Sequence, residues 1–132
     1  MKIAVVSEDG ITISQHFGRA PFYIIVTVEN GKVVSREKRE KLGHAQFATT
    51  SHRNVEEARG HGFSSESQTK HMRMAAAIAD CEILITGGMG AGAYENMKDA
   101  GIKPIVTEIT HIDEAVKAYI EGKLIDRTER ID

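Results

Sequence analysis

The chain has 132 residues, of which 41% are hydrophobic and 27% charged, and its net charge at pH 7 is −2. Domains usually span roughly 100–200 residues, so we expect a single domain over residues 1–132. The balanced charge argues against a bulk nucleic-acid binder, and the one Cys excludes a disulfide framework or a Cys-only metal site. The apolar runs are shorter than the ~18 residues of a membrane span. The chain turns polar at Ser7, too early for a signal peptide, which favours a cytoplasmic protein.

The first half of the chain predicts three strands. Lys2 to Ser7 is a short apolar run with β-branched residues, typical of a buried strand. A polar loop from Ser14 to Ala20 separates it from a second strand over Phe22 to Val28. The pair Asn30-Gly31 is a strong hairpin signal. The charged stretch from Lys32 to Glu40 is then expected to be an outer strand with a solvated edge.

Residues Gly43 to Thr69 are small and polar with little periodicity, and we expect a long loop that is mobile without ligand. Ser65 and Gln68 fit a capping box, so a helix is expected to begin near Glu66. The residues expected on its buried face are Met74, Ile78 and Cys81.

Strands and helices alternate in the second half. The expected elements are a strand over Ile83 to Thr86, a glycine loop over Gly87 to Gly92, a helix over Ala93 to Ala100 stopped by Gly101, a strand over Pro104 to Glu108, a helix capped by Thr110 and Asp113 and ended by Gly122, and a polar tail from Lys123. Strands that alternate with helices require parallel pairing and right-handed crossovers. With the antiparallel first half, this predicts an α/β fold with a mixed sheet and helices on its faces.

The glycine loop follows a strand and opens a helix, where backbone N–H groups and the helix dipole favour an anion. Gly88, Gly90 and Ala93 satisfy the G-x-G-x-x-[GA] pattern of dinucleotide sites, and Glu108 lies near the next strand end. A dinucleotide fold normally continues with a second half, whereas we expect only one β-α-β unit and one further helix in this sequence. Three interpretations therefore stay open: a nucleotide site, a site for another anion, which we favour, and a tight turn with close backbone packing.

We also expect a specific effect of replacing Gly90 with Val. The β-branched side chain would crowd the approach of an anion and strain any backbone with positive φ. Ligand binding should therefore weaken more than folding.

The loop after the first strand carries His16 and Arg19. A His can ligate a metal, and the Arg offers a fork of donors to anionic oxygens or sulfur. The alternative is a His bonded to the backbone and an Arg on the surface. Because ligands of open α/β sheets sit outside the carboxyl ends of the parallel strands, we expect this loop to share one crevice with the glycine loop.

Four further His residues lie in or beside the long loop, at spacings that lack the short gaps of a preformed zinc site. His44 and His52 fit a mobile polar loop. His61 has flanking glycines that allow a ligand to approach, and His71 begins a helix near the same cleft, so both are metal candidates. Cys81 is expected to be a core thiol. The carboxylates show no spacing typical of a paired acid and base, and we expect no enzymatic activity.

Three segments together form a recognisable pattern: Met1 to Ser7, the H-F-G-R-A-P-F-Y run from His16 to Tyr23, and the G-G-M-G loop from Gly87 that leads through Ala93-Tyr94 to Gly101-Ile102. With them the chain resembles the dinitrogenase iron–molybdenum cofactor biosynthesis family, whose NifX/NafY-like domains also end NifB proteins. The resemblance implies a three-layer α/β/α fold of the ribonuclease H-like type, with a central mixed five-stranded sheet.

The resemblance also implies a non-enzymatic carrier of an anionic metal–sulfur cluster, either iron–sulfur or molybdenum-containing. Cluster-assembly or acceptor proteins would be its partners, and it would be a monomer or weak homo-oligomer. In NafY-like members the His of the H-F-G loop is a cluster ligand, and it matches His16. Arg19 and the N–H groups of the G-G-M-G loop would neutralise the cluster's charge; this loop comprises Gly87, Gly88, Met89 and Gly90. A nucleotide- or phosphate-binding module, or a regulatory domain without ligand, remains the alternative.

Overall fold

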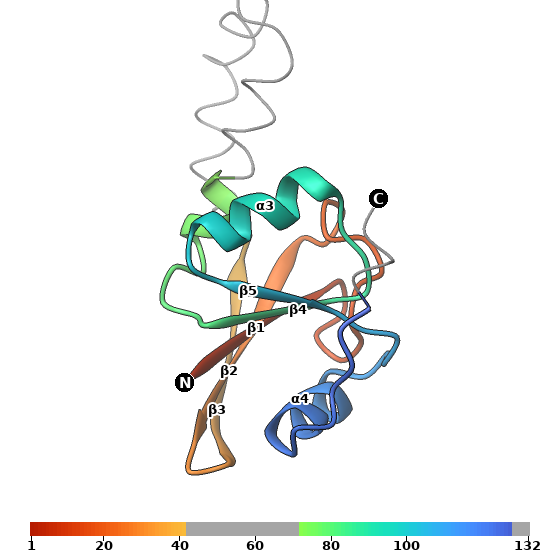
Figure 1. Ribbon diagram of the computed structural model, residues 1–132. Coiled ribbons are helices and arrows are strands. Elements are labelled where there is room, and N and C mark those ends of the chain that lie inside the picture. The colour runs from red at the N-terminus through yellow and green to blue at the C-terminus, as the bar shows by residue number, and fades with distance from the viewer. Residues whose placement is uncertain (42–71, 128–132) are drawn as a thin grey trace, which may run out of the picture.

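The computed structural model describes residues 1–41 and 72–127, which form a sheet with helices on both faces (Figure 1). Its elements are β1 (Lys2–Ser7), β2 (Phe22–Glu29), β3 (Lys32–Glu40), β4 (Ile83–Thr86), α3 (Ala91–Asp99), β5 (Lys103–Val106) and α4 (Ile112–Ile120). A helical segment at residues 72–76 continues in turns to residue 80, and we call it the 72–80 segment. Among the described residues, no helix is long and apolar enough to span a bilayer.

The five strands lie in the order β3-β2-β1-β4-β5. β1 pairs in parallel with β4, and β4 pairs in parallel with β5. β2 is antiparallel to both of its neighbours, so it runs against the other four described strands. The predicted mixed five-stranded sheet is therefore confirmed, and its strand order and directions are those of the ribonuclease H-like motif.

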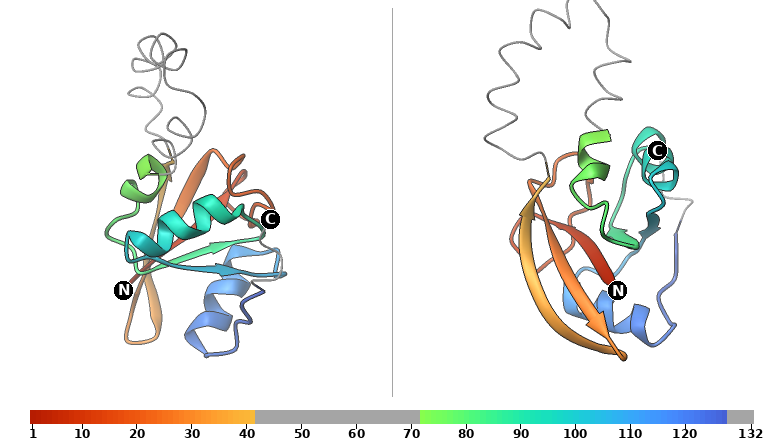
Figure 2. Two further views of the ribbon diagram at one scale, coloured as in Figure 1. Left: turned by 45° about the horizontal axis from the view of Figure 1, so that its top comes forward. Right: turned by 90° about the vertical axis from the view of Figure 1, so that its left-hand side faces the viewer.

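β1 lies at the centre of the sheet and is buried on both faces, which explains its continuous apolar run. Ala4 and Val6 belong to a core shared with the 72–80 segment and α3. Ile3 and Val5 point the other way, into a core shared with α4. The two views in Figure 2 show the resulting layers, with the 72–80 segment and α3 on one face and α4 on the other.

The hairpin between β2 and β3 is confirmed. Asn30 has a φ of 53° and Gly31 a φ of 74°, as a two-residue turn with both central residues in the left-handed region requires. β3 forms an edge of the sheet and is almost entirely exposed, as its charged sequence predicts. Arg39 ties this edge to the 72–80 segment, because its guanidinium donates to the Ala77 carbonyl at 2.9 Å and to Asp80 at 2.7 Å.

The helix boundaries differ from expectation in two places. α3 begins at Ala91, earlier than predicted, and ends before Gly101, whose φ of 84° supplies the predicted stop. The predicted caps of α4 are wrong: its N-cap is His111, and no side chain caps it. The hydroxyl of Thr110 instead lies 3.2 Å from Nδ1 of His111. Asp113, within the first turn of α4, pairs with Arg36 at 3.0 Å.

The long loop expected over residues 43–69 and the helix start expected near Glu66 lie outside the described residues. The predicted buried face of that helix is confirmed where it is described. Met74, Ile78 and Cys81 are buried in the core beneath the 72–80 segment.

Tyr23 provides a test of how the sheet is tied to the 72–80 segment. It is fully buried on β2, and its hydroxyl donates a 2.8 Å hydrogen bond to the carbonyl oxygen of Met74. Tyr23→Phe would leave that buried carbonyl without this donor, so we expect the free energy of unfolding to fall by about 1–3 kcal/mol in urea denaturation. Tyr119→Phe is the control, since Tyr119 is only half-buried, and a change below about 0.5 kcal/mol is expected there. Equal losses in the two variants would contradict the role of this hydrogen bond.

Candidate functional site

Buried polar side chains gather at one edge of the sheet, which we call the carboxyl edge. Ser7 ends β1, Thr86 ends β4, and Thr107 directly follows β5. Ser14 lies in the loop after β1, and Lys41 follows β3, which runs parallel to β1. In open α/β sheets this is the edge at which ligands bind.

These buried polar groups hold the loops of the carboxyl edge in place. The Ser7 hydroxyl donates to the carbonyl of Thr12 at 2.6 Å. The Ser14 hydroxyl donates to the carbonyl of His16 at 3.1 Å and accepts from its N–H at 3.2 Å. The Thr86 hydroxyl donates to the carbonyl of Gly88 at 2.9 Å. Hydrogen bonds within the fold therefore fix the backbone around His16 and the glycine loop, the residues predicted to contact a ligand.

The two loops singled out in the sequence lie directly against each other, as predicted. The N–H of Phe17 donates to the carbonyl of Gly88, and the N–H of Gly87 donates to the carbonyl of Ser14, both at 2.9 Å. The Phe17 ring is buried, with its centroid 6.4 Å from that of Tyr23. The Lys41 ammonium lies 4.1 Å from the Phe17 ring centroid and donates to the Phe17 carbonyl. Phe17 thus anchors the first loop in the core.

His16 and Arg19 stand on either side of this anchor, and both are exposed. The N–H groups of Arg19 and Ala20 each donate to the carbonyl of His16 at 3.1 Å, which closes a tight turn. The fold therefore presents an imidazole and a guanidinium from one short, anchored turn.

Two of the glycines are required by the close approach of the loops. A Cβ on Gly87 would lie 2.5 Å from the side-chain nitrogen of Gln15 and 2.9 Å from the carbonyl oxygen of Ser14. A Cβ on Gly88 would lie 2.6 Å from the carbonyl oxygen of Gln15. The interpretation as a turn with close backbone packing is thus correct for these two positions.

Gly90 is different, and the backbone strain considered for a Gly90→Val substitution does not arise there. Its φ is −80°, so a side chain there would meet no left-handed strain. A Cβ on Gly90 would have no heavy atom within 4 Å, and the same holds for Gly18 in the first loop. A valine side chain at Gly90 would therefore crowd a bound ligand and not the protein itself.

The N–H groups of the G-G-M-G loop are not equivalent. Those of Gly87 and Gly88 are used inside the protein, the latter by the Thr86 hydroxyl at 3.3 Å. Among the described residues, no acceptor bonds the N–H of Met89 or Gly90, and α3 has no side-chain cap. Because Met89 is buried and Gly90 is exposed, an anion would meet the backbone at Gly90 and the start of α3.

The other candidates do not join this site within the described chain. His61 and His71 lie outside the described residues. Cys81 precedes β4, at the opposite edge of the sheet, and burial raises the pKa of its thiol to about 11, as fits the predicted core thiol. Glu108, which the nucleotide interpretation would need, pairs with Arg127 at 3.4 Å. In residues 1–41 and 72–127, no group of three or more His, Cys, Asp or Glu could hold a metal.

The sequence analysis missed His111, an exposed residue that follows β5 at the carboxyl edge. Its position in the sequence, just after a third parallel strand, could have indicated that it lies at this edge. The backbone of His111 forms an isolated bridge with Thr12, which links the start of α4 to the loop after β1.

Asp9 organises that loop and has a perturbed acidity. Its carboxylate accepts hydrogen bonds from the N–H of Ile11 at 2.9 Å and from the N–H and hydroxyl of Thr12 at 2.7 and 2.8 Å. The bonds from the Thr12 and Ile11 backbone lower the pKa of Asp9 to about 2. The N–H of Ile112 in turn donates to the carbonyl of Ile11 at 3.0 Å, so this loop also positions α4.

We expect a carbon-detected NMR titration to give a midpoint of about 2 for Asp9, below the ordinary value of 3.8. Because the folded-state pKa is the lower one, ionised Asp9 stabilises the fold above the unfolded pKa, and this contribution is lost as pH falls through the folded pKa. Asp9→Asn should remove that part of the pH dependence. A midpoint at the ordinary value would show that these hydrogen bonds do not persist in solution.

The contrast between Gly88 and Gly90 is also testable. Gly88→Ala places a Cβ against the backbone of Gln15, so we expect the free energy of unfolding to fall by about 1–3 kcal/mol. Gly90→Ala meets open space and loses only the preference for Gly over Ala at the N-cap of α3, so it should cost less, about 0.5 kcal/mol. Urea denaturation of both variants measures this difference. A comparable loss at Gly90 would mean that the second half of the loop is also needed for packing.

Comparisons with known proteins identify the family and agree with the fold. The family described as "Dinitrogenase iron-molybdenum cofactor" matches residues 1–122. An uncharacterized protein of Methanocaldococcus jannaschii is 32% identical over 124 residues, which cover 94% of this chain and 89% of that protein. The crystal structure of PH0822 matches with 25% identity and a TM-score of 0.66 over 96% of each chain. The apo form of the orange protein from Desulfovibrio gigas shares the fold, with 20% identity and a TM-score of 0.65 over 96% of this chain and 92% of that one. By this evidence, the chain belongs to the dinitrogenase iron–molybdenum cofactor family.

Proposed function

We propose that this protein binds an anionic metal–sulfur cluster at the carboxyl edge and carries it, without catalysing a reaction, between cluster-assembly and acceptor proteins in the cytoplasm. Membership of the family supports an association with such a cofactor. The observation that carries the proposal is the open backbone at Gly18 and Gly90, on the two loops that touch each other.

These two glycines stand apart from the others whose surroundings are described. Four glycines have positive φ and so need to lack a side chain: Gly10, Gly31, Gly101 and Gly122. Gly87 and Gly88 are needed because the loops approach closely. Gly18 and Gly90 meet neither condition, since no heavy atom lies within 4 Å of the Cβ position. Bare backbone at both positions supports the close approach of a ligand.

The chemistry around these glycines suits a cluster with negative charge. His16 offers an exposed imidazole as a metal ligand, and Arg19 offers donors to sulfide or oxygen. The N–H groups of Met89 and Gly90 and the start of α3 add positive potential. A preassembled cluster satisfies most of its metal coordination with its own sulfides. One protein ligand with several hydrogen-bond donors is therefore suited to holding and releasing it.

A nucleotide or phosphate remains the second candidate, and the uncapped start of α3 favours it. Two observations weigh against it. The N–H of Gly88 is already bonded to Thr86, and Glu108 is paired with Arg127. Nucleotide binding to the metal-free protein distinguishes the two candidates, because a nucleotide site would need no metal and its complex would be colourless.

The proposal is tested by incubating the protein anaerobically with tetrathiomolybdate, alone and with Fe²⁺, followed by gel filtration, metal analysis and a visible spectrum. We expect His16→Ala and Gly90→Val to weaken retention of the metal–sulfur species roughly 10–100-fold. Both positions are exposed, so circular dichroism should show an intact fold. Lys32→Ala is the control, because it removes an exposed side chain at the β2–β3 hairpin, away from the carboxyl edge, and should retain the parent's spectrum.

Unchanged metal content and spectrum in the His16 variant would contradict the ligand role. Unchanged retention in the folded Gly90→Val variant would restrict the site to the His16 loop. Saturable binding of a nucleotide with no retention of the metal–sulfur species would favour the second candidate.

A further inference from the structure

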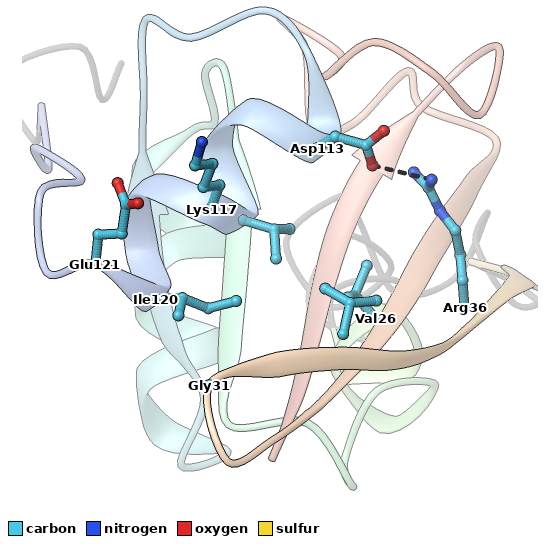
Figure 3. A pocket seen from close by; sticks show the side chains of 9 residues that line it. Val26, Gly31, Arg36, Asp113, Lys117, Ile120 and Glu121 are labelled. Carbon is cyan, nitrogen blue, oxygen red and sulfur yellow. Dashed lines mark ion pairs between the residues drawn. The ribbon is translucent and has the colours of Figure 1, made fainter.

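A pocket lies on the α4 face of the sheet, between α4 and the β2–β3 hairpin (Figure 3). It is a pocket of about 470 Å³, and none of its lining residues belongs to the two loops of the carboxyl edge. Small-molecule sites typically occupy about 300–1,000 Å³. The pocket therefore has the size of a small-molecule site and is separate from the proposed cluster site.

Aliphatic side chains line the inner part of this pocket. Val26 comes from β2, Val33 from β3, and Val116 and Ile120 from α4. Val26 and Val116 are buried in the core. Val33 is 52% exposed although it lies beside them. An apolar ligand would cover this surface.

The pocket is bounded at both ends by contacts between the strands and the helix. At one end the Arg36–Asp113 ion pair, 3.0 Å long, reaches from β3 to α4 (Figure 3). At the other end the hairpin turn approaches the helix, since a Cβ on Gly31 would lie 3.9 Å from Cγ2 of Ile120. Closed ends suit a short molecule better than an extended peptide, which needs a groove that is open along its length.

The charged end of the pocket suits a carboxylate. Arg36 presents a planar guanidinium that can bind a carboxylate through two hydrogen bonds. Its present partner, Asp113, has a side chain that is 84% exposed, and exposed ion pairs contribute little to stability. Asp113 also lies in the first turn of α4, where the helix dipole stabilises its charge without Arg36. Lys117, one turn further along α4, adds a second cation to the lining. The other carboxylate of the lining, Glu121, lies 3.9 Å from the ammonium of Lys123.

We propose that this pocket binds a small amphiphilic carboxylate. Its apolar chain lies on Val26, Val33, Val116 and Ile120, and its carboxylate replaces Asp113 as the partner of Arg36. This site does not depend on the proposed cluster-carrier function.

The test is an amide NMR titration of the full chain with sodium octanoate, and with octylammonium as a probe that has the same chain and the opposite charge. Octanoate should shift the resonances of the pocket residues saturably, and octylammonium should not. Arg36→Gln should weaken octanoate binding about tenfold or more. Asp113→Asn should strengthen it about two- to fivefold, because it frees Arg36 without removing a pocket cation. Lys38→Gln is the control: it lies on the same strand, over the Phe22 ring and outside the pocket lining.

Three results would each overturn the proposal. They are the absence of saturable shifts at the pocket residues, equal affinity for octanoate and octylammonium, and weaker octanoate binding in the Asp113→Asn variant. If diluting the protein alone shifts the same residues and octanoate does not, the pocket is a contact between copies of the chain and the proposal fails. The Asp113 variant keeps the test independent of any effect of Arg36→Gln on folding.

Discussion

The arrangement of the carboxyl edge depends on the direct backbone contact between Gly87-Gly88 and residues 14–17. Side chains at these two glycines would collide with Ser14 and Gln15. Without them, the backbones come close enough to exchange hydrogen bonds at 2.9 Å. The separation of the two loops is therefore set by backbone geometry, and the positions of His16 and Gly90 follow from it. Such a site needs little reorganisation when a ligand arrives.

The remaining constraints act at the edges of the sheet. At β3, the bonds from Arg39 to Asp80 and Ala77 hold the outer strand against the 72–80 segment, and the guanidinium keeps the pKa of Asp80 well below its usual range. At β5, the N–H of Val106 donates to the Asp126 carboxylate, and the carbonyl of Val106 accepts a hydrogen bond from the N–H of Arg127. The polar segment after α4 thus satisfies backbone groups that an edge strand would otherwise expose.

Much of the fold could be predicted from the sequence because its signals are local. Each of these signals is contained in a stretch of only a few residues: the apolar run of β1, the Asn30-Gly31 turn, and the glycines that follow α3 and α4. The cap of α4 could not be assigned in this way. Thr110 and Asp113 have the right spacing, but the chain enters the helix at His111, which pairs with the loop after β1. A tertiary contact therefore overrides the local capping pattern.

The candidate site was only partly predictable for a similar reason. The parallel strand ends correctly indicated that the His16 loop and the glycine loop would meet. The three glycines of the G-G-M-G loop look alike in sequence, however, and only their neighbours in space show that Gly87 and Gly88 serve packing while Gly90 faces open space. The pocket beside α4 is formed by β2, β3 and a helix that is distant in sequence, so no local motif indicated it. His61 and His71 remain predictions, since they lie outside the described residues.

The central position of β1 has a consequence for how the molecule assembles. Ile3 of β1 pairs with Val26 of β2, the next strand along the chain, but its parallel partner Ile83 is synthesised much later. The meander of β1, β2 and β3 can therefore form early, while the parallel half must wait for distant contacts that close slowly. The two loops of the carboxyl edge come from these separate halves and meet only in the finished fold. Any ligand that touches both loops would bind the completed chain alone and, by mass action, protect it from unfolding.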